Sequence, residues 1–205
     1  MDSVVILAKG DFPQHPIPLR ILNEARTIIC CDGAVNSLIE YGLRPSHIIG
    51  DMDSITGELK TKYEDQLIHI PAQNENDLRK AVSWAENNGA KEAIILGATG
   101  KRDDHNLANI FTLLEFPSQM EMTINTDFGK FSIVKSEHEF NSFSGEQVSI
   151  FSTDKSIEIT STHLKYKLNS KNLNSLYNGS LNESTNEYFS LNISHGQIMV
   201  YQLYK

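Results

Sequence analysis

The sequence has few cysteines and no clustered positive charge. Its 205 residues include only two cysteines, Cys30 and Cys31, which are adjacent within the apolar stretch TIICCD. Adjacent thiols in an apolar strand lack the spacing of a metal site, so we expect two inert core residues. The formal net charge is −8, and no run is rich in lysine and arginine. Because nucleic acids and anionic membranes bind clustered positive charge, neither is expected as the main partner.

Long apolar segments are lacking as well. The first residues, MDSVVILAKGD, contain neither a basic segment nor an apolar run long enough for a signal peptide or a membrane span. We therefore expect a cytoplasmic protein. The length suits one large domain or two small ones. A small molecule is the expected ligand, and an acidic protein binds an anionic one where a metal ion and a few local cations offset the charge.

The pattern of the sequence changes near residue 127. Before it, short runs rich in β-branched residues alternate with segments of helical period, which predicts an α/β domain over residues 1–127 with a mostly parallel sheet. Strands are expected at SVVILA, TIICC, HIIG, LIHI, EAIILG and MEMTIN. Helices are expected at about residues 18–25, 33–41, 57–63, 77–88 and 104–115, the fourth behind Asn76 and Asp77 as capping residues.

The pattern after residue 127 predicts a small antiparallel β-sandwich domain over residues 128–205. Polar and apolar residues alternate along FGKFSIV, EQVSIFS, SIEITST, LKYKLN, NEYFSLNIS and QIMVYQLY. Residues 169–186 are rich in asparagine and serine. We expect a long loop there, and long loops inside compact domains are often functional.

Carboxylates follow two of the predicted parallel strands. In open parallel sheets, ligands bind outside the carboxyl ends of the strands. Asp51 and Asp53 follow HIIG and, one residue apart, can both reach one divalent cation, a pattern that suits Mg²⁺. Asp32 and Gly33 follow TIICC and open a predicted helix whose N-terminus can receive an anion. The structural alternative is that Asp32 caps its helix and that Asp53 lies in a solvated turn.

Charged residues also open the fourth predicted helix. Asp77 can complete a carboxylate cluster with Asp51 and Asp53. Lys80, one turn along the helix, faces either a phosphate or solvent. Position in the sequence does not decide between these two alternatives.

A glycine-rich segment, GATGKRDDH, follows the strand EAIILG. It combines groups that bind polyphosphates: exposed backbone N–H groups, a hydroxyl, two cations and a helix N-terminus. These groups belong to Gly97, Thr99, Gly100, Lys101, Arg102 and Asp104. The segment is not a P-loop, because the spacing GxxxxGK[ST] is absent. A histidine such as His105, taken alone, is more typical of a structural hydrogen bond than of a catalytic base.

In their order and spacing, these motifs resemble the thiamine pyrophosphokinase family. CDGAVNSL resembles its DGGAN segment, PSHIIGDMDSI its GDFDS segment, NENDLRKAV its TD-x-x-KA segment, and GATGKRDDHNLANI its G-x-x-GGR-x-DH-x-x-AN segment. Downstream, THLKYKL resembles a GLKW-type strand and GSLNESTNEY a G-x-x-S-x-SNE segment. The resemblance covers nearly the whole chain.

The resemblance implies roles for individual residues. The Mg²⁺ and polyphosphate carboxylates correspond to Asp51, Asp53 and Asp77, with Asp32 as a further member. The nucleotide site takes in Gly33, Lys80, Gly97, Thr99, Gly100, Lys101, Arg102, Asp104 and His105. In the β domain, Tyr166 stands where the family usually has a tryptophan that stacks on thiamine, and Ser184 and Asn186 match positions facing the aminopyrimidine.

The implied reaction transfers a diphosphate group from ATP to the hydroxyl of thiamine, giving thiamine diphosphate and AMP. The resemblance also implies a homodimer with the thiamine site at the subunit interface. Several positions depart from the family pattern: Ala34 and Lys101 replace glycines, Asn76 replaces threonine, Tyr166 replaces tryptophan, and Thr185 precedes Asn186. The alternatives are a pyrophosphokinase for another hydroxymethyl heterocycle such as a pterin, a non-catalytic thiamine- or nucleotide-binding regulatory protein, and a magnesium-dependent phosphohydrolase.

Overall fold

The structure, a computed structural model, describes residues 2–71 and 74–205. The chain forms two compact units, unit 1 (Met1–Asp127) and unit 2 (Phe128–Lys205). Unit 1 contains 11 lysines and arginines against 19 aspartates and glutamates, whereas unit 2 contains seven of each kind. The whole formal charge of −8 therefore lies in unit 1.

Within the described residues, unit 1 is built on six parallel strands in the order β6-β5-β1-β2-β3-β4. Their bounds are β1 (Ser3–Leu7), β2 (Ile28–Cys31), β3 (His47–Gly50), β4 (Leu67–His69), β5 (Glu92–Leu96) and β6 (Glu121–Asn125). β1 is central, since Leu7 pairs with Cys30 of β2 on one side and with Leu96 of β5 on the other. The predicted parallel sheet is confirmed.

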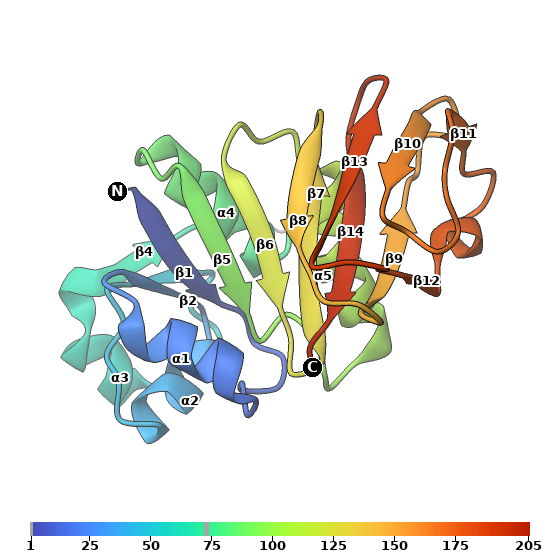
Figure 1. Ribbon diagram of the computed structural model, residues 1–205. Helices are drawn as coiled ribbons and strands as arrows, with labels where there is room; N and C mark the ends of the chain where they lie inside the picture. The colour runs from blue at the N-terminus through green and yellow to red at the C-terminus, as the bar shows by residue number, and fades with distance from the viewer. Residues whose placement is uncertain (1, 72–73) are drawn as a thin grey trace. The chain divides into compact units, whose positions relative to one another are not determined.

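In the part of the chain that the structure describes, five α-helices connect these strands. They are α1 (Pro16–Glu24), α2 (Ala34–Glu40), α3 (Gly57–Lys62), α4 (Asp77–Asn87) and α5 (Asp103–Glu115), and a 3₁₀ turn spans Glu64–Gln66. In Figure 1, α1 and α2 lie in front of the sheet of unit 1, and α4 lies behind it. Leu22 of α1 and Leu38 of α2 are fully buried in a core with Leu7 and Ile48 of the sheet. This burial of apolar side chains holds the helices to the sheet.

Both cysteines are buried free thiols on β2. Burial raises the pKa of the Cys30 thiol to about 12. Burial also raises the pKa of Cys31, and the nearby Asp77 carboxylate adds to this shift. Neither thiol ionises at neutral pH, as expected for inert core residues. Among the described residues, every helix is too short or too polar to cross a membrane.

Unit 2 consists of two antiparallel sheets around one core. Its strands are β7 (Gly129–Val134), β8 (His138–Asn141), β9 (Gln147–Phe151), β10 (Glu158–Thr162), β11 (Lys171–Asn172), β12 (Asn182–Glu183), β13 (Tyr188–Ile193) and β14 (Ile198–Leu203). One sheet has the order β12-β9-β14-β7, and the other β11-β10-β13-β8. Ile150 of the first sheet and Ile159 of the second belong to the same buried cluster. The predicted antiparallel β-sandwich is confirmed.

The predicted strand LKYKLN is not a strand. Leu164 forms only an isolated bridge with Ser184. His163 and Ser170, on either side of the segment, have φ values of 56° and 45°, so the chain turns there instead of running straight. The alternating pattern has another origin, because Leu164 and Leu168 are both buried in an irregular segment.

Residues 169–186 do not form an unstructured loop either. They contain β11, β12 and a 3₁₀ turn, Leu176–Gly179. Side-chain amides help to hold the segment, since Asn172 Nδ2 donates to the Ile157 carbonyl at 3.1 Å. Asparagine-rich composition therefore marks short elements held by side-chain hydrogen bonds.

Candidate active site

The candidate site lies at the point where the strand order of unit 1 reverses. The chain leaves β1 towards β2 and later returns to β5 on its other side. Ligands in open parallel sheets bind in the crevice at such a point, outside the carboxyl ends of the strands. The backbones after β1 and β5 meet there, because Gly10 N donates to Gly97 O at 2.7 Å and Asp11 N donates to Thr99 O at 2.8 Å.

A cavity of about 670 Å³ opens at this place. It has carboxylates from the segment after β3 and from the start of α4, and cations from the segment after β5. The predicted site residues that line it are Asp51, Asp77, Lys80, Gly100, Lys101, Arg102, Asp104 and His105. The structure thus brings together residues that are up to 54 positions apart in the sequence. Asn109 also lines the cavity, and its amide donates to the Ala98 carbonyl at 2.8 Å.

Three carboxylates converge at the acidic side of the site. Asp32, Asp51 and Asp53 can each offer one oxygen, and these oxygens lie within 4.8 Å of one another. They meet because β2 and β3 are neighbours, with Cys31 paired to Ile49, so that the residues following the two strands lie side by side. The hard oxygen donors of this carboxylate group suit a divalent cation such as Mg²⁺.

Asp32 is the buried member of the carboxylate group, with 1 % of its surface exposed. Its Oδ2 accepts a hydrogen bond from Ser54 N at 3.1 Å. Its Oδ1 is one of two buried side-chain atoms without a hydrogen-bond partner among the described residues. Burial raises the pKa of Asp32, and the charge of Asp77 adds to the shift. A buried carboxylate oxygen without a hydrogen-bond partner destabilises the fold. A bound cation would offset this cost, so Asp32 is suited to be a metal ligand.

Asp77, in contrast, does not belong to this group of three. Lys80, which is 4 % exposed, donates through Nζ to Asp77 Oδ1 at 3.0 Å. Asp77 and Asp32 approach each other beside Gly50, which has no side chain to separate them. A Cβ at Gly50 would lie 3.3 Å from Asp77 Oδ1 and 2.8 Å from Asp32 Cβ. The structure therefore gathers Asp32 with Asp51 and Asp53, and it places Asp77 beside them with a cation of its own.

Arg102 and Asp104 form a two-pronged ion pair at the start of α5. Arg102 Nε donates to Asp104 Oδ1 at 3.0 Å, and its terminal nitrogen donates to Oδ2 at 2.6 Å. The hydrogen bonds from Arg102 lower the pKa of Asp104, and the same contact raises the pKa of Arg102. Both side chains are mostly exposed, so the pair is free to open when an anionic ligand offers a better partner for Arg102.

In unit 2, the predicted substrate residues lie along two facing segments. The Tyr166 side chain is 62 % exposed, and its backbone exchanges hydrogen bonds of 2.8 and 3.0 Å with the side chain of Asn182. Ser184 is fully buried, and its hydroxyl donates to the Asn186 carbonyl at 3.0 Å. Tyr166 is thus available to a flat ligand, whereas the Ser184 hydroxyl holds the turn at Asn186.

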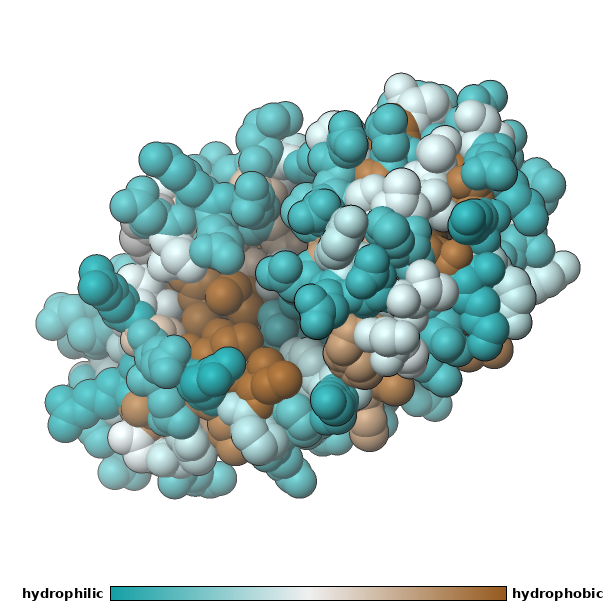
Figure 2. Space-filling model, in the orientation of Figure 1, coloured by the Kyte–Doolittle hydropathy of each residue, from teal (hydrophilic) through white to brown (hydrophobic). Residues whose placement is uncertain are grey.

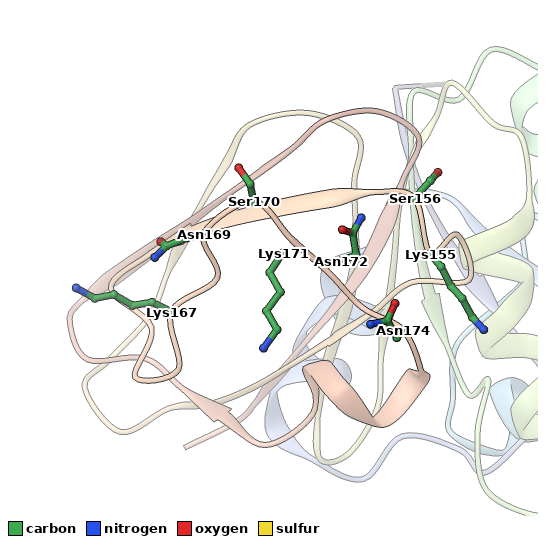
Figure 3. Close-up of a pocket in the computed structure, with 8 residues that line it drawn as sticks. All are labelled: Lys155, Ser156, Lys167, Asn169, Ser170, Lys171, Asn172 and Asn174. Atoms are coloured by element: carbon green, nitrogen blue, oxygen red, sulfur yellow. The ribbon is translucent and has the colours of Figure 1, made fainter.

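A second cavity, of about 790 Å³, lies in unit 2 and is open and polar. Its lining consists of Lys155, Ser156, Lys167, Asn169, Ser170, Lys171, Asn172 and Asn174. Figure 3 shows the Lys155 and Lys167 side chains pointing in different directions. Within the described residues, the lining does not include Tyr166, Ser184 or Asn186. This cavity is therefore separate from the predicted substrate residues.

Comparison with known proteins identifies the family. The family model described as the thiamin pyrophosphokinase catalytic domain matches residues 19–125, and the model of the thiamin pyrophosphokinase substrate-binding domain matches residues 129–201. The chain belongs to the thiamin pyrophosphokinase family. The family resemblance drawn from the motifs is confirmed. A pterin-type pyrophosphokinase and a regulatory binding protein are not favoured.

Curated thiamin pyrophosphokinases are related over about half of the chain. Thiamin pyrophosphokinase 1 of Caenorhabditis elegans is 29% identical over 114 residues, which cover 51% of this chain and 46% of the relative. Thiamine pyrophosphokinase of Bacillus subtilis is 32% identical over 116 residues, which cover 54% and 53%. The chain spans about half the length of the curated relatives it matches.

Solved structures of thiamin pyrophosphokinases share the fold over the full chain. The crystal structure of the Bacillus subtilis protein aligns with a TM-score of 0.80 at 20% identity, covering 98% of this chain and 99% of that one. The Candida albicans protein aligns with a TM-score of 0.79 at 18% identity, covering 98% and 90%. The α/β unit followed by a β-sandwich is therefore the fold of thiamin pyrophosphokinases.

Two departures from the thiamin pyrophosphokinase motifs have a local physical account. Asn76, which replaces threonine, caps α4 by accepting a hydrogen bond from Arg79 N at 2.9 Å, and both residue types serve as N-caps. Lys101, which replaces a glycine, has a φ of 46°, in the left-handed region that favours glycine. Its Nζ donates to the Lys9 carbonyl at 3.1 Å, which offsets part of the backbone strain.

We expect Lys101→Ala to be less stable than Lys101→Gly by about 1 kcal/mol, because alanine retains the strained φ while both variants lose the hydrogen bond to Lys9. Urea denaturation of the two variants, at equal protein concentration, measures the difference. Equal stability would show that the φ at position 101 carries no strain.

Proposed function

We propose that the chain is a thiamine pyrophosphokinase, which transfers the β,γ-diphosphate of ATP to the hydroxyl of thiamine and releases AMP. The observation that carries this proposal is the cavity at the carboxyl ends of β1 and β5, which is lined by Asp51 and Asp77 together with Lys101 and Arg102. Such a combination suits a polyphosphate held between a metal ion and cations. The matches to both family domains, in chain order, support the choice of substrates.

Asp51 and Asp53 are proposed as Mg²⁺ ligands. Asp32 joins them because its oxygen lies in the same group and Oδ1 is buried without a partner in the described part of the chain. Asp77 remains a ligand candidate because of the family motif. To bind the cation, it would give up its ion pair with Lys80. Bound there, the cation would neutralise charge on the polyphosphate.

In the proposed reaction, the hydroxyl oxygen of thiamine forms a bond to the β-phosphorus. The bond from that phosphorus to the oxygen bridging to the α-phosphorus breaks, and AMP leaves with the bridging oxygen. Arg102 and the backbone N–H groups around Gly97 and Gly100 hold the phosphates in line for this displacement. We assign the hydroxyl proton to Asp77, which lines the cavity. Because the transition state is loose, proton transfer to this base contributes little to the rate.

Tyr166 is proposed to stack on the cationic thiazolium ring, together with polar contacts near Ser184 and Asn186. We expect Tyr166→Ala to raise the KM for thiamine about three- to thirtyfold, because it removes an aromatic face opposite a cation. Tyr166→Trp should leave this KM unchanged or lower. Initial-rate measurements at saturating ATP give both values, and Tyr177→Ala, at another exposed tyrosine, is the control. An unchanged KM in Tyr166→Ala would remove Tyr166 from the thiamine site.

The homodimer implied by the family resemblance, with its thiamine site at the subunit interface, and the cytoplasmic location expected from the sequence stay predictions. The test of the reaction is to measure AMP and thiamine diphosphate formed from ATP and Mg²⁺, with and without thiamine. The two products appearing together, only with thiamine, support the proposal. ADP or free phosphate in their place would indicate a phosphorylating kinase or a hydrolase.

A further inference from the structure

Lys9 extends from the end of β1 into the candidate active site, although no motif points to it. The backbone is fixed on both sides of this residue, since Ala8 N donates to Leu96 O at 2.8 Å and Gly10 N donates to Gly97 O at 2.7 Å. Lys101 also donates to the Lys9 carbonyl. Lys9 lines the cavity of about 670 Å³. Its side chain therefore starts from a defined position at the point where the strand order reverses.

The Lys9 ammonium is linked to the carboxylate group through one serine. Lys9 Nζ donates to Ser54 Oγ at 2.6 Å, and Ser54 Oγ donates in turn to Asp53 Oδ1 at 2.9 Å. The backbone N–H of Ser54 donates to Asp32. A single residue thus connects the ammonium to two of the three carboxylates. Among the described residues, no ion pair within 4.0 Å involves Lys9, so its charge is not tied to one acid.

Gly33 provides the room for this ammonium. A Cβ at Gly33 would lie 2.8 Å from Lys9 Cε and 3.0 Å from Lys9 Nζ. The φ of Gly33 is −65°, which any residue adopts, so backbone conformation does not require glycine here. A larger residue at position 33 would displace the flexible end of the Lys9 side chain from its present position. Gly33 therefore lets the ammonium lie where it does, beside Ser54, whose Cβ would be 3.0 Å from the same Cβ.

We propose that Lys9 contacts the polyphosphate of the nucleotide, and that in the absence of nucleotide it serves as the internal counter-cation of the carboxylate group. The inference rests on the proposed function of the site. Unit 1 carries the whole net charge of −8, so an anionic ligand needs local cations to enter. When a polyphosphate binds, Lys9 Nζ exchanges the neutral Ser54 hydroxyl for a phosphate oxygen, which is the stronger partner for an ammonium.

Removal of the Lys9 charge then has two effects of opposite sign. The carboxylates bind a divalent cation more tightly, because the ammonium no longer repels it, and we expect about a three- to tenfold gain in affinity. The KM for MgATP rises about tenfold or more, because a charge-assisted contact to phosphate is lost. A residue with a merely structural function would weaken both, since it would disturb the carboxylates and the cavity together.

The experiment compares Lys9→Met with wild type and with Lys91→Met, which removes an equal charge from a side chain 82 % exposed. Mn²⁺ binding without nucleotide is measured by electron paramagnetic resonance, and the KM for MgATP by initial rates. Lys9→Gln is a second variant should Lys9→Met fold poorly, and Lys9→Arg should restore much of the KM. Tighter Mn²⁺ binding together with a higher KM, in the Lys9 variant alone, supports the inference.

Weaker or unchanged Mn²⁺ binding, or an unchanged KM, in a folded Lys9 variant would overturn it. These outcomes are distinct from failure of the proposed function. If the wild type forms no thiamine-dependent AMP, the proposed function fails, and the Mn²⁺ comparison alone then supports or overturns the counter-cation part of the inference. If the wild type is active and the Lys9 variants behave like Lys91→Met, only the inference fails.

Discussion

The variant Asp51→Asn/Asp53→Asn is expected to lose thiamine-dependent AMP formation by at least about 10³-fold. The two carboxylates follow β3 and share a group with Asp32 in which one oxygen from each lies within 4.8 Å of the others. Asparagine retains the shape of aspartate and removes the charge, so the loss reports on metal and phosphate binding and not on packing. A coupled assay for AMP measures the rate.

The matched control is Glu64→Gln/Asp65→Asn, which removes two negative charges from an exposed 3₁₀ turn of the same unit. This control is expected to keep nearly full activity. Mn²⁺ binding should disappear in the first double variant and persist in the second. Activity of the Asp51→Asn/Asp53→Asn variant within about tenfold of wild type would exclude these two carboxylates as essential metal ligands.

Asp32→Asn is expected to stabilise the metal-free protein by about 1–2 kcal/mol at pH 8, while it weakens binding of a divalent cation. Burial raises the pKa of Asp32 above its ordinary value, and the carboxylate is 1 % exposed. The ionised form is therefore more costly in the folded chain than in the unfolded one. Asparagine avoids this cost, and its side-chain oxygen can still accept the hydrogen bond from Ser54 N.

The pH dependence of this difference has a definite sign. Because the folded-state pKa is raised, the folded protein holds the Asp32 proton at pH values where the unfolded chain has released it. The contribution of Asp32 to stability is therefore fully present below the unfolded pKa of about 4, and it is lost as the pH rises through the folded pKa. The advantage of Asp32→Asn should be largest at pH 8 and vanish near pH 4.

Urea denaturation in the presence of EDTA, at pH 8 and pH 4, measures both values. Asp65→Asn, at an exposed position, is expected to change stability by less than about 0.5 kcal/mol at either pH. A metal-free Asp32→Asn protein that is less stable than wild type at pH 8 would contradict the interpretation of Asp32 as a buried acid whose ionised form destabilises the fold.

The sequence predicts most of the fold because β1, β2 and β3 of unit 1 are buried on both faces. Such strands are short continuous runs of β-branched residues, as in β2 and β3, and these runs are visible without any knowledge of pairing. LKYKLN was predicted wrongly as a strand for a related reason. Alternation predicts that every second side chain is buried. Here only Leu164 and Leu168, four positions apart, are buried between two left-handed residues, and Tyr166 between them is 62 % exposed.

The candidate site could be predicted from the sequence only where its residues lie close together in the chain. Asp51 and Asp53 are close in the sequence, so their proximity follows from the chain itself. Asp32 joins them because β2 lies beside β3, and Lys9 reaches Ser54 because β1 lies at the centre of the sheet. Neither neighbour relation is specified by spacing, since the order of parallel strands depends on how the crossover helices pack. The separation of Asp77 from the group of Asp32, Asp51 and Asp53 has the same origin.

The central position of the first strand also affects how the chain folds as it is synthesised. β1 pairs with β2 early, but its other edge remains open until Glu92–Leu96 has been made. During that interval an apolar strand edge, carried by VVIL, is available for pairing with another chain. Parallel pairings across such sequence distances form slowly. Nascent chains that end before β5 should therefore be prone to aggregation, and completion of β5 is the event that closes the sheet around its own N-terminus.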